Sequence, residues 1–281
     1  MAFDKDGFLS STMDGFRGSV REVPTYKCWF DFAEDLNRLG WAMLDGHETT
    51  TSDNQRLLIS VLFIRAHQSF QAAILLIERG MLSDARVVLR SATEGAIALN
   101  ALANDPAFDM QLIEAHWHTQ RRTGRIVLSN ATYREQHSAD EIAQIEKTVA
   151  DIDTKEKAAG HSFREVVWAN VAAKHCLDLY DLIYRSLSHD GTHTNVAAVH
   201  RFLKFDASGG PTALRFGPTT HDLVDVARMA CLMFLWAADP FARAHALKFK
   251  PQIETMIQRL EELPCEEPAD VSVEARFAGQ E

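Results

Sequence analysis

Apolar residues recur at helical spacing from Asp31 almost to the end of the chain, in segments separated by short polar or glycine-containing turns. The pattern predicts about seven or eight helices. The clearest two run over residues 54–79 and 83–104. Gly80, between them, is expected to end the first in a left-handed conformation, and Ser83 is expected to cap the start of the second. The two segments therefore predict a tight helical hairpin.

The rest of the chain continues this pattern with one exception. Further helices are predicted over residues 107–129, 139–158 and 162–188, from Thr219 or Thr220 to Ala238, and from Pro251 onward. Between residues 202 and 216, two short runs with phenylalanine flank a Ser-Gly-Gly-Pro turn, which predicts a β-hairpin. The predicted fold class is all-α, an antiparallel multi-helix bundle with one small β-hairpin insertion.

The chain length and the pattern together predict one main domain. Its 281 residues correspond to about 1.9 typical domain lengths, but no linker is evident. We expect residues 1–53 to be an N-terminal helical extension and residues 54–263 to be the helical bundle domain, with the hairpin near 202–216. Residues 264–281 are acidic and contain proline, which predicts a disordered tail.

Composition and charge narrow the class of protein. With 29 Lys and Arg against 39 Asp and Glu, the net charge of −10 argues against a broad DNA-binding face, although a local basic pocket stays possible. The longest apolar runs, 57–64 and 229–238, are shorter than the roughly 20 residues that span a membrane. The four scattered cysteines support neither a zinc ribbon nor a disulfide framework. A cytoplasmic protein without a membrane partner is expected.

The densest polar cluster of the sequence lies at the end of the predicted helix 162–188. It holds Tyr184, Arg185, Ser188, His189 and His193. Their spacing places Arg185 and Ser188 on one helix face, and polar side chains can converge at a helix end without occupying the core. We take Arg185, His189 and His193 as candidate catalytic residues. The alternative is that these residues only cap the helix, because helix C-termini favour His and Gly for electrostatic and backbone reasons.

A second candidate group lies on the predicted helical hairpin. Arg90 and Glu94 are one turn apart beside a stripe of small residues, and His67 lies on the preceding helix. A charge near a helix interface must find a partner. These three residues are candidate binding residues, together with Tyr184 and Ser188, if the two groups meet. Taken singly, an intrahelical ion pair and a core histidine are the simpler interpretations.

Other kinds of site have little support. His189 and His193 have the spacing of helical zinc ligands, but Gly191 lies between them and no Glu completes an H-E-x-x-H motif. The sequence contains no G-x-S-x-G elbow, no P-loop and no G-x-G-x-x-G. No metal and no cofactor are expected, and metal-dependent hydrolysis is the weakest hypothesis.

Two segments together carry a resemblance to a known family. The run Ser83-Asp84-Ala85-Arg86-Val87-Val88-Leu89-Arg90-Ser91-Ala92-Thr93-Glu94 and the later run Leu182-Ile183-Tyr184-Arg185-Ser186-Leu187-Ser188-His189 resemble DUF5677, a family of bacterial all-helical proteins of unknown function. The resemblance extends over about residues 60–200. It implies a helical bundle without an established activity. Six residues then fall at characteristic positions of the family: Arg90, Glu94, Tyr184, Arg185, Ser188 and His189.

That family is similar in outline to the HEPN proteins, antiparallel helical bundles that often dimerise and include metal-independent ribonucleases of toxin and antiphage systems. Their signature is an Arg followed, after about four to six residues, by a His near a helix end. This sequence departs from it, because three residues separate Arg185 from His189 and seven separate it from His193. Two hypotheses follow. The polar cluster is structural or binds a small ligand or a partner protein; alternatively, the chain is a homodimeric ribonuclease that acts on RNA.

Overall fold

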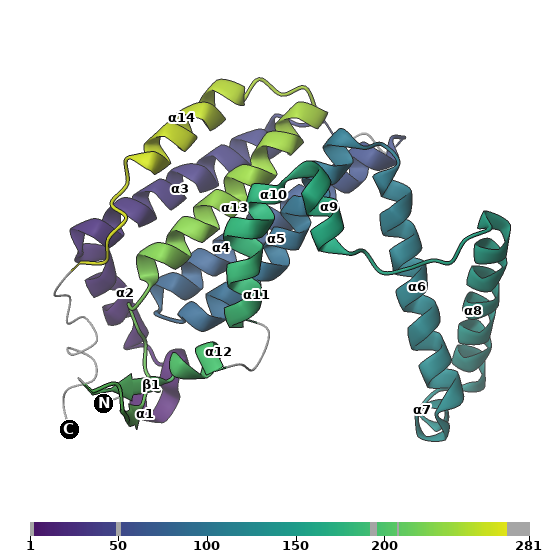
Figure 1. The fold of residues 1–281 in the computed structure, drawn as a ribbon, viewed down its shortest axis with the longest axis horizontal. Coiled ribbons are helices and arrows are strands. Elements are labelled where there is room, and N and C mark those ends of the chain that lie inside the picture. Colours follow the sequence, from purple (N-terminus) through teal and green to yellow (C-terminus); the bar gives the residue numbers. More distant parts are fainter. Residues whose placement is uncertain (1–2, 49–51, 192–195, 207, 269–281) are drawn as a thin grey trace. The chain divides into compact units, whose positions relative to one another are not determined.

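The computed structural model describes residues 3–48, 52–191, 196–206 and 208–268. The chain forms two compact units (Figure 1). Unit 1 contains Met1–Asn104 and Ala172–Glu281, and unit 2 contains Asp105–Val171. The range 54–263, for which the sequence predicts one bundle, therefore contributes to both units. Each unit is described by itself.

Four long helices make the core of unit 1. They are α3 (Pro24–Asp45), α4 (Asn54–Glu78), α5 (Leu82–Asn104) and α13 (Leu223–Ala244), and they lie side by side in Figure 1. Helix α4 packs on α5, and α13 packs on α3, α4 and α5. Phe63, Phe234 and Phe241 are fully buried between them, and Ala85 and Ala96 on α5 have no exposed surface, which permits close helix approach. The predicted all-α bundle is confirmed.

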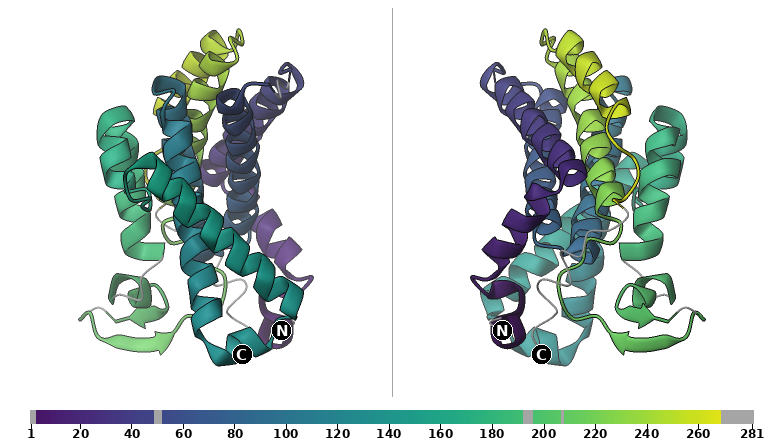
Figure 2. Two further views of the ribbon diagram at one scale, coloured as in Figure 1. Left: turned by 90° about the vertical axis from the view of Figure 1, so that its right-hand side faces the viewer. Right: turned by 90° about the vertical axis from the view of Figure 1, so that its left-hand side faces the viewer.

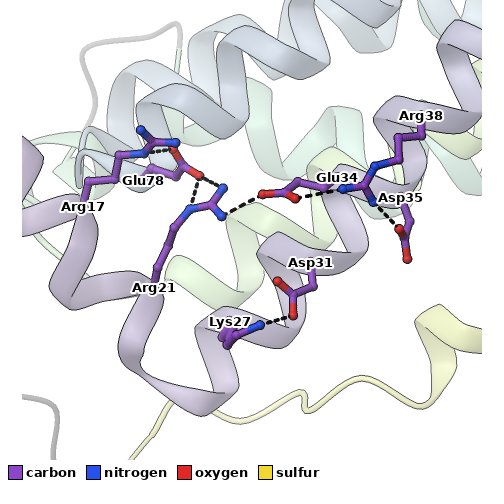
Figure 3. Close-up of polar contacts among 8 residues, drawn as sticks. All are labelled: Arg17, Arg21, Lys27, Asp31, Glu34, Asp35, Arg38 and Glu78. Carbon is purple, nitrogen blue, oxygen red and sulfur yellow. Dashed lines mark hydrogen bonds and ion pairs between the residues drawn. The ribbon is translucent and has the colours of Figure 1, made fainter.

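The N-terminal helices are joined to this core by an ion-pair cluster (Figure 3). Helices α1 (Phe3–Asp6) and α2 (Met13–Glu22) precede α3, with the 3₁₀ turn η1 (Gly7–Leu9) between them. The buried carboxylate of Glu78 on α4 accepts hydrogen bonds from Arg17 Nε and Arg21 Nε on α2, each over 2.6 Å. Arg21 also donates to Glu34 on α3 over 2.7 Å. Because a buried carboxylate is costly without partners, this cluster fixes α2 against α4.

The segment after the last helix also contacts the core. Helix α14 (Lys250–Glu261) packs on α3 and α13. Beyond it, Pro264 O accepts a hydrogen bond from Trp29 Nε1 over 2.9 Å, and the Glu267 carboxylate accepts from the hydroxyl of Tyr26 and the backbone N–H of Val224. Aromatic donors of α3 and a backbone donor of α13 therefore hold the first residues of the segment 264–281, for which the sequence predicts a disordered tail. Residues 269–281 lie outside the described part.

Unit 2 is built around an antiparallel helix pair. It contains α6 (Phe108–Ser129), α7 (Ala131–Glu135) and α8 (Ala139–Ala159). Gly124 on α6 permits the close approach of α8, because a Cβ there would lie 2.7 Å from Val149 Cγ2. Arg125 donates to Asp153 across the pair over 2.8 Å. Helix α8 ends at Gly160, which has the left-handed φ of 71°, as its sequence predicts.

The predicted helix 162–188 is interrupted in the structure. The segment contains α9 (Trp168–His175), α10 (Leu177–Leu179), the π-helical turn η2 (Tyr180–Tyr184) and α11 (Arg185–Gly191). The break lies at Cys176, whose φ of −165° and ψ of 58° are not helical. The periodicity of apolar residues continues across Cys176 and therefore predicts no break. Tertiary packing can override local helix propensity at such a point.

The predicted hairpin is confirmed. After α12 (Val196–His200), strand β1 (Leu203–Phe205) pairs antiparallel with β2 (Pro211–Leu214), and Figure 2 shows the hairpin at one end of the helices of unit 1. The start of the next helix was predicted incorrectly. Helix α13 begins at Leu223, and its N-cap is Asp222 rather than the expected Thr219 or Thr220, because Asp222 adopts a left-handed φ of 67° and turns the chain there.

Helix α4 also bears on the expectation that no segment spans a membrane. Within the described residues, this one helix is long and apolar enough to cross a bilayer by length and composition alone, with 39% of its most apolar window buried. The shorter apolar run 57–64 does not reveal this property, because the helix extends well beyond it. The core helix of a bundle passes the same test, and α4 lies against α3, α5 and α13.

Candidate functional site

Four of the sequence-predicted residues meet at the interface between α5 and the segment that follows the break at Cys176. Arg90 Nε donates to Ser188 Oγ over 3.2 Å, and Arg90 Nη2 donates to the Tyr184 hydroxyl over 3.0 Å. The Tyr184 hydroxyl in turn donates to Glu94 Oε1 over 2.9 Å. Arg90 Nη1 lies 3.4 Å from the same carboxylate oxygen. We call these four residues the Arg90 cluster.

The cluster is half-buried. The side chains of Arg90 and Glu94 are 25% and 26% exposed, whereas Tyr184 is 9% exposed. Burial, followed by the hydrogen bond to Glu94, raises the pKa of Tyr184 above its usual value. The phenol therefore stays protonated at neutral pH, as a donor to Glu94 requires. The guanidinium of Arg90 also lies 5.2 Å from the centre of the Tyr184 ring, within cation–π distance.

The π-helical turn η2 explains how Tyr184 and Ser188 reach α5. A π-turn holds one more residue than an α-turn and changes the direction of the side chains that follow. Tyr184 ends η2, and Ser188 lies one turn further along α11. Both side chains contact Arg90. π-turns within helices occur frequently at functional sites.

Arg185 does not join the cluster. Its side chain is 69% exposed, lies 3.3 Å from Asp181 in an ion pair one turn away, and stands over the Tyr180 ring. The expectation that Arg185 and Ser188 share a face is wrong, because Ser188 faces α5 while Arg185 faces solvent. Whether Arg185 is catalytic stays a prediction.

The side chains of the two predicted catalytic histidines lie outside the described part of the chain. His189 belongs to α11, and its side chain is outside the described part. His193 lies entirely outside the described residues. Their roles remain predictions.

His67 belongs to a different place. It is 2% exposed on α4, its Nε2 lies 2.8 Å from Asn37 Oδ1, and Gln71 donates to the same oxygen. Burial lowers the pKa of His67 below its ordinary value, so the ring is neutral at pH 7. Helix α3 approaches it closely at Gly40, where a Cβ would lie 2.9 Å from Nε2. His67 is a core residue and not a member of the cluster.

One charged group was missed by the sequence interpretation. Arg86, one turn before Arg90 on α5, is only 2% exposed, and its Nη2 lies 3.4 Å from Asp222 Oδ2. Arg201 Nη1 donates to the same oxygen over 2.5 Å. These residues come from three distant segments, so no spacing in the sequence connects them. The one available signal was an arginine placed directly beside the alanine stripe of α5.

The metal-ligand and thiol side chains of the described residues were the remaining candidates for a reactive site. Among the described residues, no group of three or more His, Cys, Asp or Glu side chains is arranged to hold a metal ion. Cys176 and Cys231 are buried free thiols. Burial raises the pKa of Cys176 to about 12 and also raises that of Cys231, so neither is a thiolate at neutral pH.

A comparison of the sequence with protein-family models identifies one family. Residues 56–211 match the model of DUF5677, a family of unknown function. The chain belongs to the DUF5677 family. No curated protein matches the chain, and no solved structure matches it.

The DUF5677 region contains the whole Arg90 cluster. It extends from α4 through α5, unit 2 and α9 to α12 as far as the first residue of β2. Helices α3, α13 and α14 lie outside it. Because α13 packs on both α4 and α5, the DUF5677 region does not complete its own core in this protein and depends on flanking helices.

Proposed function

We propose that this protein is a binding protein without catalytic activity of its own, in which the Arg90 cluster is a structural latch between α5 and α11. One observation carries the proposal. Each of the three guanidinium nitrogens of Arg90 has a partner inside the cluster, namely Ser188, Tyr184 and Glu94. A catalytic arginine needs donors directed at the substrate, whereas this one directs its donors at Ser188 on α11, Tyr184 in η2 and Glu94 on its own helix.

The latch has a clear structural task. Without it, the segment after Cys176 would contact α5 mainly through apolar residues such as Leu179, Ile183 and Leu187, which are all buried. Apolar contacts are not directional, but charged hydrogen bonds fix a rotation and a register. The latch therefore sets the orientation of α11 and of the chain that continues into α12 and the hairpin. A small ligand or a partner protein that contacts this segment would then meet a fixed surface.

The stability of two arginine variants tests the latch. Arg90→Ala removes the three interactions and leaves Glu94 and the buried Tyr184 hydroxyl without their cation, so the free energy of unfolding should fall by about 2 kcal/mol. Arg185→Ala is the matched control, because this arginine is exposed in a simple i, i+4 pair; its effect should stay within about 0.5 kcal/mol. Urea unfolding followed by circular dichroism measures both. Equal stability of Arg90→Ala and the wild type would contradict the latch and favour a functional site carried at a cost to the fold.

A metal-independent ribonuclease is the second candidate function. Arg185 favours it, since its guanidinium is exposed and has one carboxylate partner among the described side chains. In that mechanism His189 or His193 would act as general acid or base on the ribose 2′-OH or the leaving oxygen, and Arg185 would stabilise the developing charge.

RNA incubated with purified protein in chelator distinguishes the two functions. We expect RNA to stay intact with the wild type, Arg185→Ala and His189→Ala. Degradation by the wild type that both substitutions abolish would overturn the binding-protein proposal and establish the ribonuclease. We also propose that the protein is a homodimer in the cytoplasm, as expected from the sequence. The molar mass from light scattering checks the dimer, and fluorescence microscopy of the tagged chain checks the location.

A further inference from the structure

A small cavity lies where the start of α5 meets the base of the β-hairpin and the segment before α13. Its volume is about 70 Å³, which is room for several water molecules or one small anion. Three basic side chains line it, those of Arg201, Arg215 and His221. Three phenylalanines, Phe8, Phe202 and Phe216, line it as well. The cavity lies within unit 1 and shares no residue with the Arg90 cluster.

Arg201, which lines the cavity, belongs to a group of charged side chains around Asp222. Asp222 Oδ2 accepts from Arg201 over 2.5 Å and lies 3.4 Å from Nη2 of the buried Arg86. Burial acts to raise the pKa of Asp222, but the hydrogen bond from Arg201 and the nearby His221 and Arg86 outweigh it and lower the pKa. The carboxylate is therefore ionised, and its single charge is shared by two guanidinium groups.

Arg215 is the other arginine that lines the cavity. Its Nη1 donates to Thr219 Oγ1 over 2.7 Å. Within the part of the chain that is described, its buried Nε has no hydrogen-bond acceptor. Such a donor is costly unless something accepts from it. Two arginines, Arg201 and Arg215, and one carboxylate, that of Asp84, line the cavity. Behind them, Arg86 and Arg201 share the single charge of Asp222, so the balance favours an anion.

The helix that begins beside the cavity adds to this field. Leu82, Ser83 and Asp84 form the first turn of α5 and line the cavity. The backbone N–H groups of a first helical turn have no partner within the helix, and the helix dipole places partial positive charge there. The oxygens of a phosphate group are the acceptors that such a combination of arginines and backbone donors binds most readily.

The aromatic residues point to the rest of the ligand. Phe202 is 53% exposed and Phe216 is 77% exposed. The backbone hydrogen bond from Arg215 N to Phe202 O, over 2.8 Å, holds the two chain segments together at the base of the hairpin. Exposed rings next to a phosphate-sized basic cavity provide a surface on which a nucleobase stacks.

We propose that this cavity binds the phosphate group of a nucleoside monophosphate, whose base lies on Phe202 and Phe216. The proposal goes beyond the proposed binding protein with its Arg90 latch, because it names a separate site and a ligand class. A mononucleotide fits better than an RNA strand. The basic residues that would contact the ligand line one small cavity, and the chain as a whole has a net charge of −10.

Isothermal titration calorimetry with AMP, adenosine and inorganic phosphate tests the site. AMP should bind at least tenfold more tightly than either adenosine or phosphate, because each of these has only half of the recognised chemistry. Arg215→Gln should weaken the binding of AMP and of phosphate at least tenfold. Phe216→Ala should weaken the binding of AMP severalfold and leave that of phosphate unchanged. The exposed Arg38 on α3 provides the control, and Arg38→Gln should bind AMP as the wild type does.

Several results would overturn the proposal. Wild-type protein that shows no saturable binding of AMP at millimolar concentration would exclude the site. Unchanged AMP binding in Arg215→Gln would place the ligand elsewhere, and equal affinities for AMP and phosphate would remove the base from the proposal. Tighter, strongly salt-dependent binding of poly(U) than of AMP would identify RNA as the ligand instead. Because Phe216 is largely exposed, Phe216→Ala keeps the test valid even if Arg215→Gln fails to fold. None of these outcomes depends on the stability of Arg90→Ala.

Discussion

The hydroxyl group of Tyr184 lies 2.9 Å from Glu94 Oε1, to which it donates a hydrogen bond across the interface between η2 and α5. The oxygen of the Tyr184 hydroxyl in turn accepts a hydrogen bond from Arg90 Nη2. One buried phenol therefore connects an arginine and a glutamate that are one turn apart on a single helix. A phenylalanine would fill the same space but could neither donate nor accept.

Tyr184→Phe should for this reason destabilise the protein without creating a cavity. The loss of two hydrogen bonds to charged groups at a half-buried site should lower the free energy of unfolding by about 1–2 kcal/mol. Tyr180→Phe is the matched control, because Tyr180 stacks on Tyr184 at 4.9 Å between ring centroids but lies outside the cluster. Parallel urea titrations measure the difference between the two variants. Equal effects of both substitutions would show that the Tyr184 hydroxyl contributes nothing to the latch.

The sequence predicts most helices of this fold because their ends carry strong local signals. Gly80 ends α4 with a φ of 69° and Gly160 ends α8 with a φ of 71°, as their positions after apolar periodic runs indicate. The segment 162–188 carries no comparable signal at Cys176, and its periodicity continues across the break. Neither the π-turn η2 nor the separation of unit 2 leaves a mark in the pattern of apolar residues.

The candidate site was predictable for a different reason. Arg90 and Glu94 beside an apolar seam need polar partners, and Tyr184 and Ser188 supply them. The placement of Arg185 was wrong because residues three apart on an α-helix still differ by about 60° around its axis. This difference lets Ser188 face α5 while Arg185 reaches solvent. The cavity at Arg201 and Arg215 could not be predicted at all, since its residues converge only through tertiary packing.

Gly80 and Gly95 should respond to alanine in opposite ways. At Gly80 the backbone is left-handed, and a Cβ would lie 2.7 Å from the backbone nitrogen of Thr219 and 2.8 Å from Pro218 Cβ. We expect Gly80→Ala to lower the free energy of unfolding by about 2–4 kcal/mol. At Gly95, inside α5, a Cβ meets nothing within 4 Å, so Gly95→Ala should raise it by about 0.5–1 kcal/mol.

Thermal unfolding of the two glycine variants beside the wild type checks this prediction. The melting temperatures should lie on opposite sides of that of the wild type. A Gly80→Ala variant as stable as the wild type would mean that the contact between the α4–α5 turn and Thr219 is not as close as described. Because Gly80 also lines the cavity, Gly80→Ala should weaken AMP binding as well.

Two histidines in unit 1 should make the stability depend on pH. His47 and His245 lie with their Nε2 atoms 2.8 and 3.1 Å from Ser60 Oγ, and their ring centroids are 4.2 Å apart. Burial, followed by the charges of His47 and Arg56, lowers the pKa of His245 to about 4, while Asp53 acts in the opposite direction. Burial also lowers the pKa of His47. The ring of His245 is therefore neutral in the folded protein near pH 6.

The sign of the pH dependence follows from these shifts. Below the ordinary value of 6.5, the unfolded chain binds more protons on these two histidines than the folded chain does. The free energy of unfolding therefore falls as the pH falls from about 6.5 toward 4, the pKa of His245 in the folded chain. For His245 alone, between pH 7.5 and 5, the loss should be about 1–2 kcal/mol after allowance for its partial exposure. Urea midpoints across this range measure the slope. His245→Gln should flatten it, and the exposed control His200→Gln should not; an equal slope in His245→Gln and the wild type would exclude His245 as its source.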